Sequence, residues 1–248
     1  MPRRGRLGPW YRLAIVLLKP PTLLLTRREQ SGLEHVPAGG IVVAANHVAT
    51  ADPVLLTDFV LYGMRRTPRF LAKSSLFRGN GLTGRVMRGA GQIPVDRHAA
   101  DASRALDAAV AALARGETVV IYPEGTVTQD PDLWPMRART GVARLALLSG
   151  VPVVPVAQWG AQHAGLRRSL APRLPGRRTV VRFRVGRPVD LSPWAGRELT
   201  ADVLREATDA VMEAVTRELE VLRGEPAPAQ RYDPRGTRPV DEDGRRSA

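Results

Sequence analysis

The chain has 248 residues, 44% of them apolar, which is enough for one large α/β domain or two small ones with a buried core. It contains no cysteine, which excludes a thiol nucleophile, disulfides and thiolate metal sites. Its four histidines are scattered and form no HExxH pair, so we expect neither a metal ion nor a cofactor.

The formal net charge of +13 comes from an uneven excess of basic residues. Residues 1–30 hold seven basic side chains and one acidic, and residues 163–189 hold eight arginines and no acid. The positive electrostatic field of such clusters favours anionic partners: phospholipid headgroups, a phosphorylated substrate, an acidic carrier protein or nucleic acid. A coding bias toward arginine and alanine is the alternative. Because the aromatic interleaving of single-strand binders is missing, we expect no nucleic-acid partner.

The first 30 residues are basic, then apolar, then basic again. Pro20 and Pro21 divide the apolar part into two segments, each shorter than the roughly 20 residues that cross a bilayer. No small-residue cleavage site follows, so we expect no secretory signal peptide. Trp10, Tyr11 and nearby arginines favour two short helices in the membrane interface, which predicts a peripheral, monotopic protein on the cytoplasmic face of an anionic membrane. Two helices packed on the domain are the alternative.

The most informative stretch begins with residues 41–45, an apolar β-branched run that predicts a strand buried on both faces. His47 follows it, and Asp52 stands directly before Pro53. Asp52 and Pro53 predict the start of a helix over 53–62, because a carboxylate can accept from the free N–H groups of a first turn. His47 and Asp52 can form a general base and the carboxylate that fixes its tautomer. A strand-end histidine beside an ordinary cap is the alternative.

The rest of the chain alternates predicted strands and helices. Strands are predicted at residues 69–72, 91–97, 118–122, 153–157 and 179–185, and helices between Asp101 and Gly116 and at 136–149 and 200–223. Pro155 indicates that its strand lies at an edge or contains a bulge.

This pattern predicts one α/β domain, with a mixed, largely parallel central sheet flanked by helices and preceded by the N-terminal interfacial helices. We expect those helices in residues 1–30, the catalytic domain in 31–223 and a disordered tail in 224–248, which is rich in proline, glycine and charge.

A second apolar strand ends in polar residues. Residues 118–122 run directly into Pro123, Glu124, Gly125 and Thr126. In open α/β sheets, ligands bind beyond the carboxyl ends of strands, so two such ends predict one site.

Four separated blocks together resemble the glycerolipid acyltransferase family typified by 1-acylglycerol-3-phosphate acyltransferase, which makes phosphatidic acid. The blocks are Asn46, His47 and Asp52 in an NHxxxxD pattern, GQIPVDR ending in Arg97, YPEGT over 122–126, and VPVVPV over 151–156.

The resemblance implies that His47 deprotonates the free hydroxyl of lysophosphatidic acid and that Asp52 orients His47. The resulting oxygen attacks a fatty acyl thioester, supplied by acyl-CoA or acyl carrier protein as co-substrate. No acyl-enzyme is needed, which agrees with the lack of cysteine and of a GxSxG elbow. Arg97 resembles the family's phosphate ligand, and guanidinium geometry suits bidentate phosphate binding. A surface Arg97 paired with Asp96 is the alternative.

The resemblance also implies a substrate-binding role for several neighbours. Glu124, Gly125 and Thr126 resemble the block that shapes the acceptor pocket, where backbone N–H groups could approach a phosphate or the thioester oxyanion. Asn46 adjoins the base, and Lys73 could add charge for either substrate. Alternatively, Glu124 caps a turn and Lys73 is simply solvated. The fourth block is expected to be structural.

Two departures from the family pattern concern the third block, which commonly begins with Phe and has a basic residue or serine after Gly-Thr. Here these positions are Tyr122 and Val127. The second change leaves the acceptor open, so acylation of another lysophospholipid or glycolipid alcohol is an alternative, as is a non-catalytic lipid-binding protein of the same fold. The sequence predicts neither the chain length of the acyl group nor an oligomeric state.

Overall fold

The computed structural model describes residues 7–79, 81–95, 99–163, 178–234 and 236, without the side chains of 99–102. They form one α/β domain around a seven-stranded sheet with the order β1-β7-β6-β2-β5-β3-β4. Only the β6–β7 pair is antiparallel. The predicted fold class is therefore confirmed. The strands are β1 (Thr26–Ser31), β2 (Ile41–Ala45), β3 (Pro68–Lys73), β4 (Ile93–Val95), β5 (Thr118–Ile121), β6 (Val153–Trp159) and β7 (Thr179–Val185).

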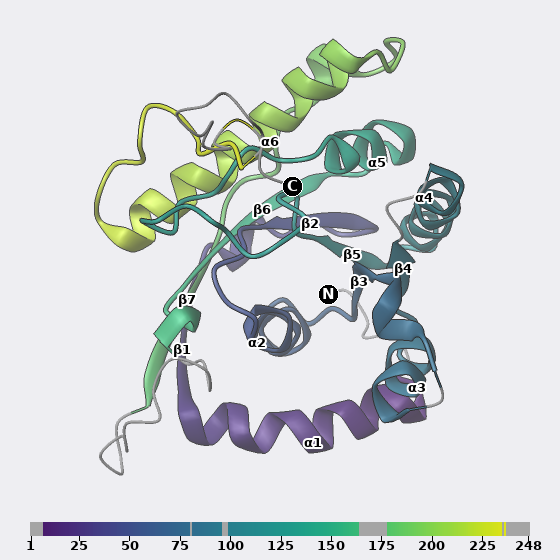
Figure 1. The fold of residues 1–248 in the computed structure, drawn as a ribbon, viewed down its shortest axis with the longest axis vertical. Coiled ribbons are helices and arrows are strands. Elements are labelled where there is room, and N and C mark those ends of the chain that lie inside the picture. The colour runs from purple at the N-terminus through teal and green to yellow at the C-terminus, as the bar shows by residue number, and fades with distance from the viewer. Residues whose placement is uncertain (1–6, 80, 96–98, 164–177, 235, 237–248) are drawn as a thin grey trace, which may run out of the picture.

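Helices cover both faces of the sheet (Figure 1). The α-helices are α1 (Pro9–Leu25), α2 (Asp52–Asp58), α3 (Leu82–Gly89), α4 (Ala99–Ala114), α5 (Gly141–Ser149) and α6 (Ala201–Arg223). A π-helical turn, η2 (Phe59–Gly63), continues α2, and short 3₁₀ turns are η1 (Leu33–His35), η3 (Ser74–Phe77), η4 (Ala161–His163) and η5 (Ser192–Trp194).

Strand β2 lies at the centre of the core, and all five of its residues are buried. Ile41, Val43 and Ala45 pack into the cluster beneath α2, whereas Val42 and Ala44 join the cluster of α4, α5 and α6 on the other face. This two-sided burial explains why β2 is a continuous apolar run, as is typical of parallel sheets covered by helices.

Helix α5 begins later than the sequence predicted. The segment 136–140 is not helical, because three of its N–H groups donate to distant acceptors: Met136 to Glu124 Oε2, Arg137 to the Tyr232 carbonyl and Arg139 to the Pro123 carbonyl. The first four N–H groups of a helix have no intrahelical partner, so these bonds act by holding the segment on a different backbone path.

Pro155 lies in an interior strand, not at an edge, and it marks a bulge. Val156 pairs with Val185, but the next bridge joins Val153 to Val189, so the β7 side holds one extra residue. The Pro155 carbonyl accepts from the Gly186 N–H at 2.9 Å. The missing N–H of proline falls where the ladder is interrupted, which is how sheets accommodate proline.

The two short N-terminal helices predicted from the sequence are one continuous helix, α1, followed by strand β1. Pro20 and Pro21 lie inside this helix. They remove the hydrogen bonds to the carbonyls of Val16 and Leu17, two residues that are 67% and 50% exposed, so water can reach that side of the helix.

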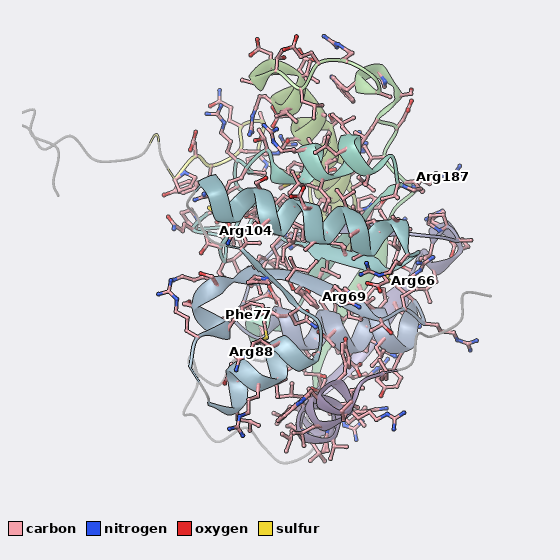
Figure 2. The ribbon with its side chains drawn as sticks, turned by 90° about the vertical axis from the view of Figure 1, so that its right-hand side faces the viewer. Arg66, Arg69, Phe77, Arg88, Arg104 and Arg187 are labelled. Atoms are coloured by element: carbon pink, nitrogen blue, oxygen red, sulfur yellow. The ribbon has the colours of Figure 1, made fainter. Side chains whose placement is uncertain are left out.

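Helix α1 lies on the far side of α2 from the sheet and beside α3 (Figure 1). The Trp10 ring packs against Gly89 of α3, and Tyr11 is the buried residue of α1. On α3, Arg88 donates to the carbonyls of Phe77 and Gly79 and so fixes the turn between η3 and α3 (Figure 2). Large apolar side chains of this region stay exposed, namely Leu13, Val16, Leu17, Leu18, Leu23, Leu24, Leu25, Leu76 and Leu82.

Across the described residues, we find no helix with the length and apolarity that a membrane span requires.

Part of the predicted tail lies along α6. The Ala227 N–H donates to Glu220 at 2.8 Å, Arg231 lies 3.8 Å from Asp209, and Asp233 accepts from Arg137 at 2.8 Å. Residues 237–248 of that tail are outside the described residues.

Candidate active site

His47 directly follows β2, and the loop after β5 holds its main chain on both sides. The His47 N–H donates to Glu124 Oε1 at 3.0 Å, and its carbonyl accepts from the Thr128 N–H at 2.7 Å. Its ring stacks on Tyr122, with centroids 4.2 Å apart and planes 18° from parallel. The two strand ends singled out in the sequence therefore meet at this histidine.

Asp52 is fully buried, and its Oδ2 atom accepts three hydrogen bonds: from His47 Nδ1 at 2.8 Å, from the Val48 N–H at 2.6 Å and from the Ala49 N–H at 2.8 Å. The expectation that Asp52 caps the first turn of the following helix is wrong. Ala51 is the N-cap of α2, and the Asp52 carboxylate caps the preceding loop instead. The same contacts fix the loop that bears His47.

This geometry selects one histidine tautomer. An ionised carboxylate only accepts hydrogen bonds, so Nδ1 carries the proton and the Nε2 lone pair is free. Among the described residues, Nε2 has no hydrogen-bond partner, and His47 lines a cavity. The arrangement can take a proton from a hydroxyl group in that cavity and stabilise the imidazolium that forms.

Glu124 is buried and bridges two backbone segments. Its Oε1 accepts from His47, and its Oε2 accepts from the Met136 N–H at 2.9 Å. Burial raises the pKa of this carboxyl group to about 8, against the opposing effect of the two backbone hydrogen bonds. Its side chain does not line the cavity, so the structure places Glu124 behind the histidine.

Asn46 is also buried and bonds with Gln158 at the end of β6. The Asn46 amide donates to the Gln158 carbonyl at 3.1 Å and accepts from its N–H at 2.8 Å, while Gln158 Nε2 donates to the Asn46 carbonyl at 2.7 Å. Both ends of the Asn46 amide are thus used within the protein. Asn46 joins β2 to β6 immediately before the histidine and is not among the cavity-lining residues.

A cavity of about 420 Å³ lies beside His47. Its walls are mainly apolar side chains from α1, α2, β3 and α3, including Ile15, Leu18, Val54, Leu61 and Met87. His47 and Tyr122 border it together with Lys73, Gly125 and Thr126. An apolar chamber with a histidine base and a few polar groups fits a molecule with a hydrocarbon part and a reacting polar part.

The predicted substrate-binding residues fall into two groups. Lys73, Gly125 and Thr126 border the cavity, whereas Asn46 and Glu124 lie behind it. The Gly125 N–H already donates to the Tyr122 carbonyl at 3.0 Å, so it closes a turn. Arg97 lies outside the described residues.

Sequence reasoning missed Gln158 and Thr128 as supports of the histidine loop. The sequence could have indicated Gln158, because Gln158 is the first polar residue after an apolar run, as Asn46 is. Thr128 carried no such signal, since a threonine in an irregular loop is common.

No group of three or more His, Asp or Glu side chains that could hold a metal ion occurs within the part of the chain that the structure describes.

A histidine at the carboxyl end of β2, oriented by a buried carboxylate and beside an apolar cavity, is an arrangement that can activate a hydroxyl group. The family model described as Acyltransferase matches residues 27–159, and the chain belongs to this acyltransferase family. This confirms the resemblance expected from the sequence.

One solved structure is similar to this chain over most of its length. It is the 1-acyl-sn-glycerophosphate (LPA) acyltransferase, PlsC, from Thermotoga maritima, with a TM-score of 0.60 and 27% sequence identity. The similarity covers 88% of this chain and 81% of that one. No curated protein matches the sequence.

Proposed function

We propose that the protein transfers a fatty acyl chain from an acyl thioester to the free hydroxyl of lysophosphatidic acid, giving phosphatidic acid. The observation that carries this proposal is the His47–Asp52 pair at 2.8 Å, which leaves Nε2 directed to an apolar cavity in a member of the acyltransferase family. The similar Thermotoga maritima protein is a 1-acyl-sn-glycerophosphate acyltransferase, which supports the choice of acceptor.

In the proposed step, His47 Nε2 takes the hydroxyl proton as the acceptor oxygen attacks the thioester carbonyl carbon. The C–O bond forms, the C–S bond then breaks, and the thiolate leaves with the proton that His47 held. Asp52 keeps the imidazole in its Nδ1–H tautomer and stabilises its charged form. The acyl chain lies in the apolar cavity, and the turn at Gly125 and Thr126 lies beside the reacting carbonyl. Apart from the acyl-CoA or acyl carrier protein co-substrate, the proposal requires no cofactor.

We also propose that the enzyme works on the cytoplasmic face of an anionic membrane, as a peripheral protein. The exposed leucines of α1 support this, since Leu17 and Leu24 are 50% and 70% exposed and the exposed cations Arg12 and Arg27 precede and follow them in the chain. Apolar side chains beside cations suit the boundary between acyl chains and anionic headgroups.

The test is an acceptor and donor panel with the purified protein. Labelled acyl-CoA and acyl carrier protein thioesters are each incubated with lysophosphatidic acid and with lysophospholipids that carry other headgroups. We expect transfer to lysophosphatidic acid and a loss of 10²-fold or more in kcat for His47→Ala, about the contribution of a general base. The exposed His163 supplies the matched control, His163→Ala. Transfer to none of the acceptors, or full activity in His47→Ala, contradicts the proposal.

Arg97 remains a predicted phosphate ligand. Arg97→Ala is expected to raise KM for the acceptor far more than KM for the donor, because only the acceptor's phosphate would lose its partner. Initial rates with each substrate varied in turn measure both constants. An equal rise in the two would refute this role.

A further inference from the structure

The position of His47 depends on a loop with no regular secondary structure, residues 124–139, which we call the clamp loop. Its first part holds the His47 main chain through Glu124 and Thr128. Its far part holds these two residues in turn: the Thr128 hydroxyl donates to the Trp134 carbonyl at 2.7 Å, and the Met136 N–H donates to Glu124 at 2.9 Å. A displacement of Trp134 or Met136 would therefore be transmitted to the histidine.

The far part of the clamp loop is anchored by Arg223, the last residue of α6. The Arg223 guanidinium lies between two rings, 4.0 Å from the centroid of Trp134 and 4.4 Å from that of Trp159. It also donates to the Asp132 carbonyl at 2.7 Å, and its side chain is only 11% exposed. Cation–π contacts are strongest where water is largely excluded, as it is here.

The chain that follows α6 supplies a second anchor. The Arg137 N–H donates to the Tyr232 carbonyl at 2.9 Å, and the Arg137 side chain pairs with Asp233 at 2.8 Å. The segment is itself fixed to α6 where Ala227 donates to Glu220. Because the Arg137 side chain is 52% exposed, the ion pair contributes little, and Arg223 is the main anchor.

We propose that Arg223, assisted by Tyr232 and Asp233, is a positioning residue for His47 and acts through the clamp loop. None of the three lines the cavity beside His47, so their effect falls on the placement of the base and not on substrate binding. The kinetic part of this inference rests on the proposed acyl-transfer function.

The experiment compares full-length variants. Arg223→Ala removes the stacking and the charge, and Arg223→Lys keeps the charge without the planar group. Arg223→Ala combined with Asp233→Ala removes in addition the Arg137–Asp233 ion pair. Arg217→Ala is the matched control, since Arg217 is an exposed arginine on the same helix and, within the described residues, pairs with its neighbour Glu213. For each variant we measure kcat, both KM values, and hydrogen exchange at the His47 and Met136 amides.

We expect the double variant to lose about tenfold in kcat, since displacing a base by a fraction of an ångström misaligns proton transfer. Arg223→Ala should lose less, Arg223→Lys less again, and Arg217→Ala nothing, with every KM within about twofold of wild type. Exchange at both amides should become faster in the order of the kcat losses.

Unchanged kcat in the double variant would overturn the proposal, as would a rise in KM without a fall in kcat. If Arg223→Ala does not fold, the test rests on Arg223→Lys and Asp233→Ala. Exchange at the His47 amide as slow as in wild type in both of these variants contradicts the proposal. Failure of the acyl-transfer proposal would appear separately, as wild-type protein that transfers nothing. In that case the exchange rates alone test whether Arg223 anchors the loop.

Discussion

Two regions differ in how far their groups are bonded within the protein: the carboxyl-terminal edge of the sheet, where His47 follows β2, and the exposed face of α1. At the edge, the backbone N–H, the carbonyl and the Nδ1 atom of His47 are all bonded within the protein, and Asp52 is fully buried. On the outer face, apolar side chains such as Val16 and Leu24 are 67% and 70% exposed and carry no comparable contacts. The protein fixes His47, the proposed base, through internal hydrogen bonds and leaves a surface suited to an apolar partner, which we propose to be the membrane.

The largest expected effect is at the edge, with Asp52→Asn. An asparagine can present its N–H group to Nδ1, which would favour the tautomer with the proton on Nε2 and remove the base. We expect kcat to fall on the order of 10³-fold. Rates at saturating substrate, with the melting temperature as a control for folding, measure this. Activity within tenfold of wild type would show that Asp52 is only a loop cap.

A large effect is also expected at the exposed face of α1, on membrane binding and not on kcat. Replacing Val16, Leu17 and Leu24 by serine removes apolar surface that would enter the bilayer, so binding to anionic vesicles should weaken on the order of 10²-fold. The rate with detergent-dispersed substrates should stay near wild type. Val221→Ser on α6 is the control, because Val221 is also apolar and 60% exposed. Equal binding by both variants would exclude α1 as the docking face.

A smaller effect concerns the stability of the edge and its pH dependence. The folded state raises the pKa of Glu124 to about 8, so this group favours folding while it is protonated and disfavours it once it ionises. Stability should fall between about pH 5 and pH 8, by up to about 1.4 kcal/mol for each pH unit in which Glu124 ionises in the unfolded chain but not in the folded protein. Glu124→Gln cannot ionise and should lack this fall. Urea unfolding from pH 5 to pH 9 compares the two, and parallel curves would contradict the assignment.

The smallest effect is expected at Gly125, which lines the cavity with φ +76°. Gly125→Ala should destabilise the protein by about 1 kcal/mol, because this backbone conformation disfavours a Cβ atom and the new atom would lie 3.2 Å from Arg139 Nε. Gly141→Ala, where a Cβ meets nothing within 4 Å, is the control. Thermal unfolding of both variants tests whether the turn is fixed by its backbone.

Much of the fold could be predicted from local patterns. The strands β2, β5 and β7 lie within a residue of their predicted bounds, since apolar runs and alternation are set by which faces are buried. The helix predicted over 136–149 loses its first turn because hydrogen bonds to Glu124, Tyr232 and Pro123 hold that segment on a different backbone path. Local periodicity cannot register acceptors that are distant in the sequence.

The sequence by itself determined the pair to which we assign the chemistry. His47 and Asp52 are five residues apart, so a short loop after β2 is enough to bring Nδ1 and Oδ2 to 2.8 Å. Only the tertiary structure decided what surrounds them: Glu124 and Asn46 lie behind the base, α1 closes the cavity, and Arg223 holds a loop from the far end of the chain. The contacts of Glu124, Asn46 and Arg223 join segments separated by about a third of the chain or more. The partners of all these groups are set by sheet order and helix packing, which no local pattern encodes.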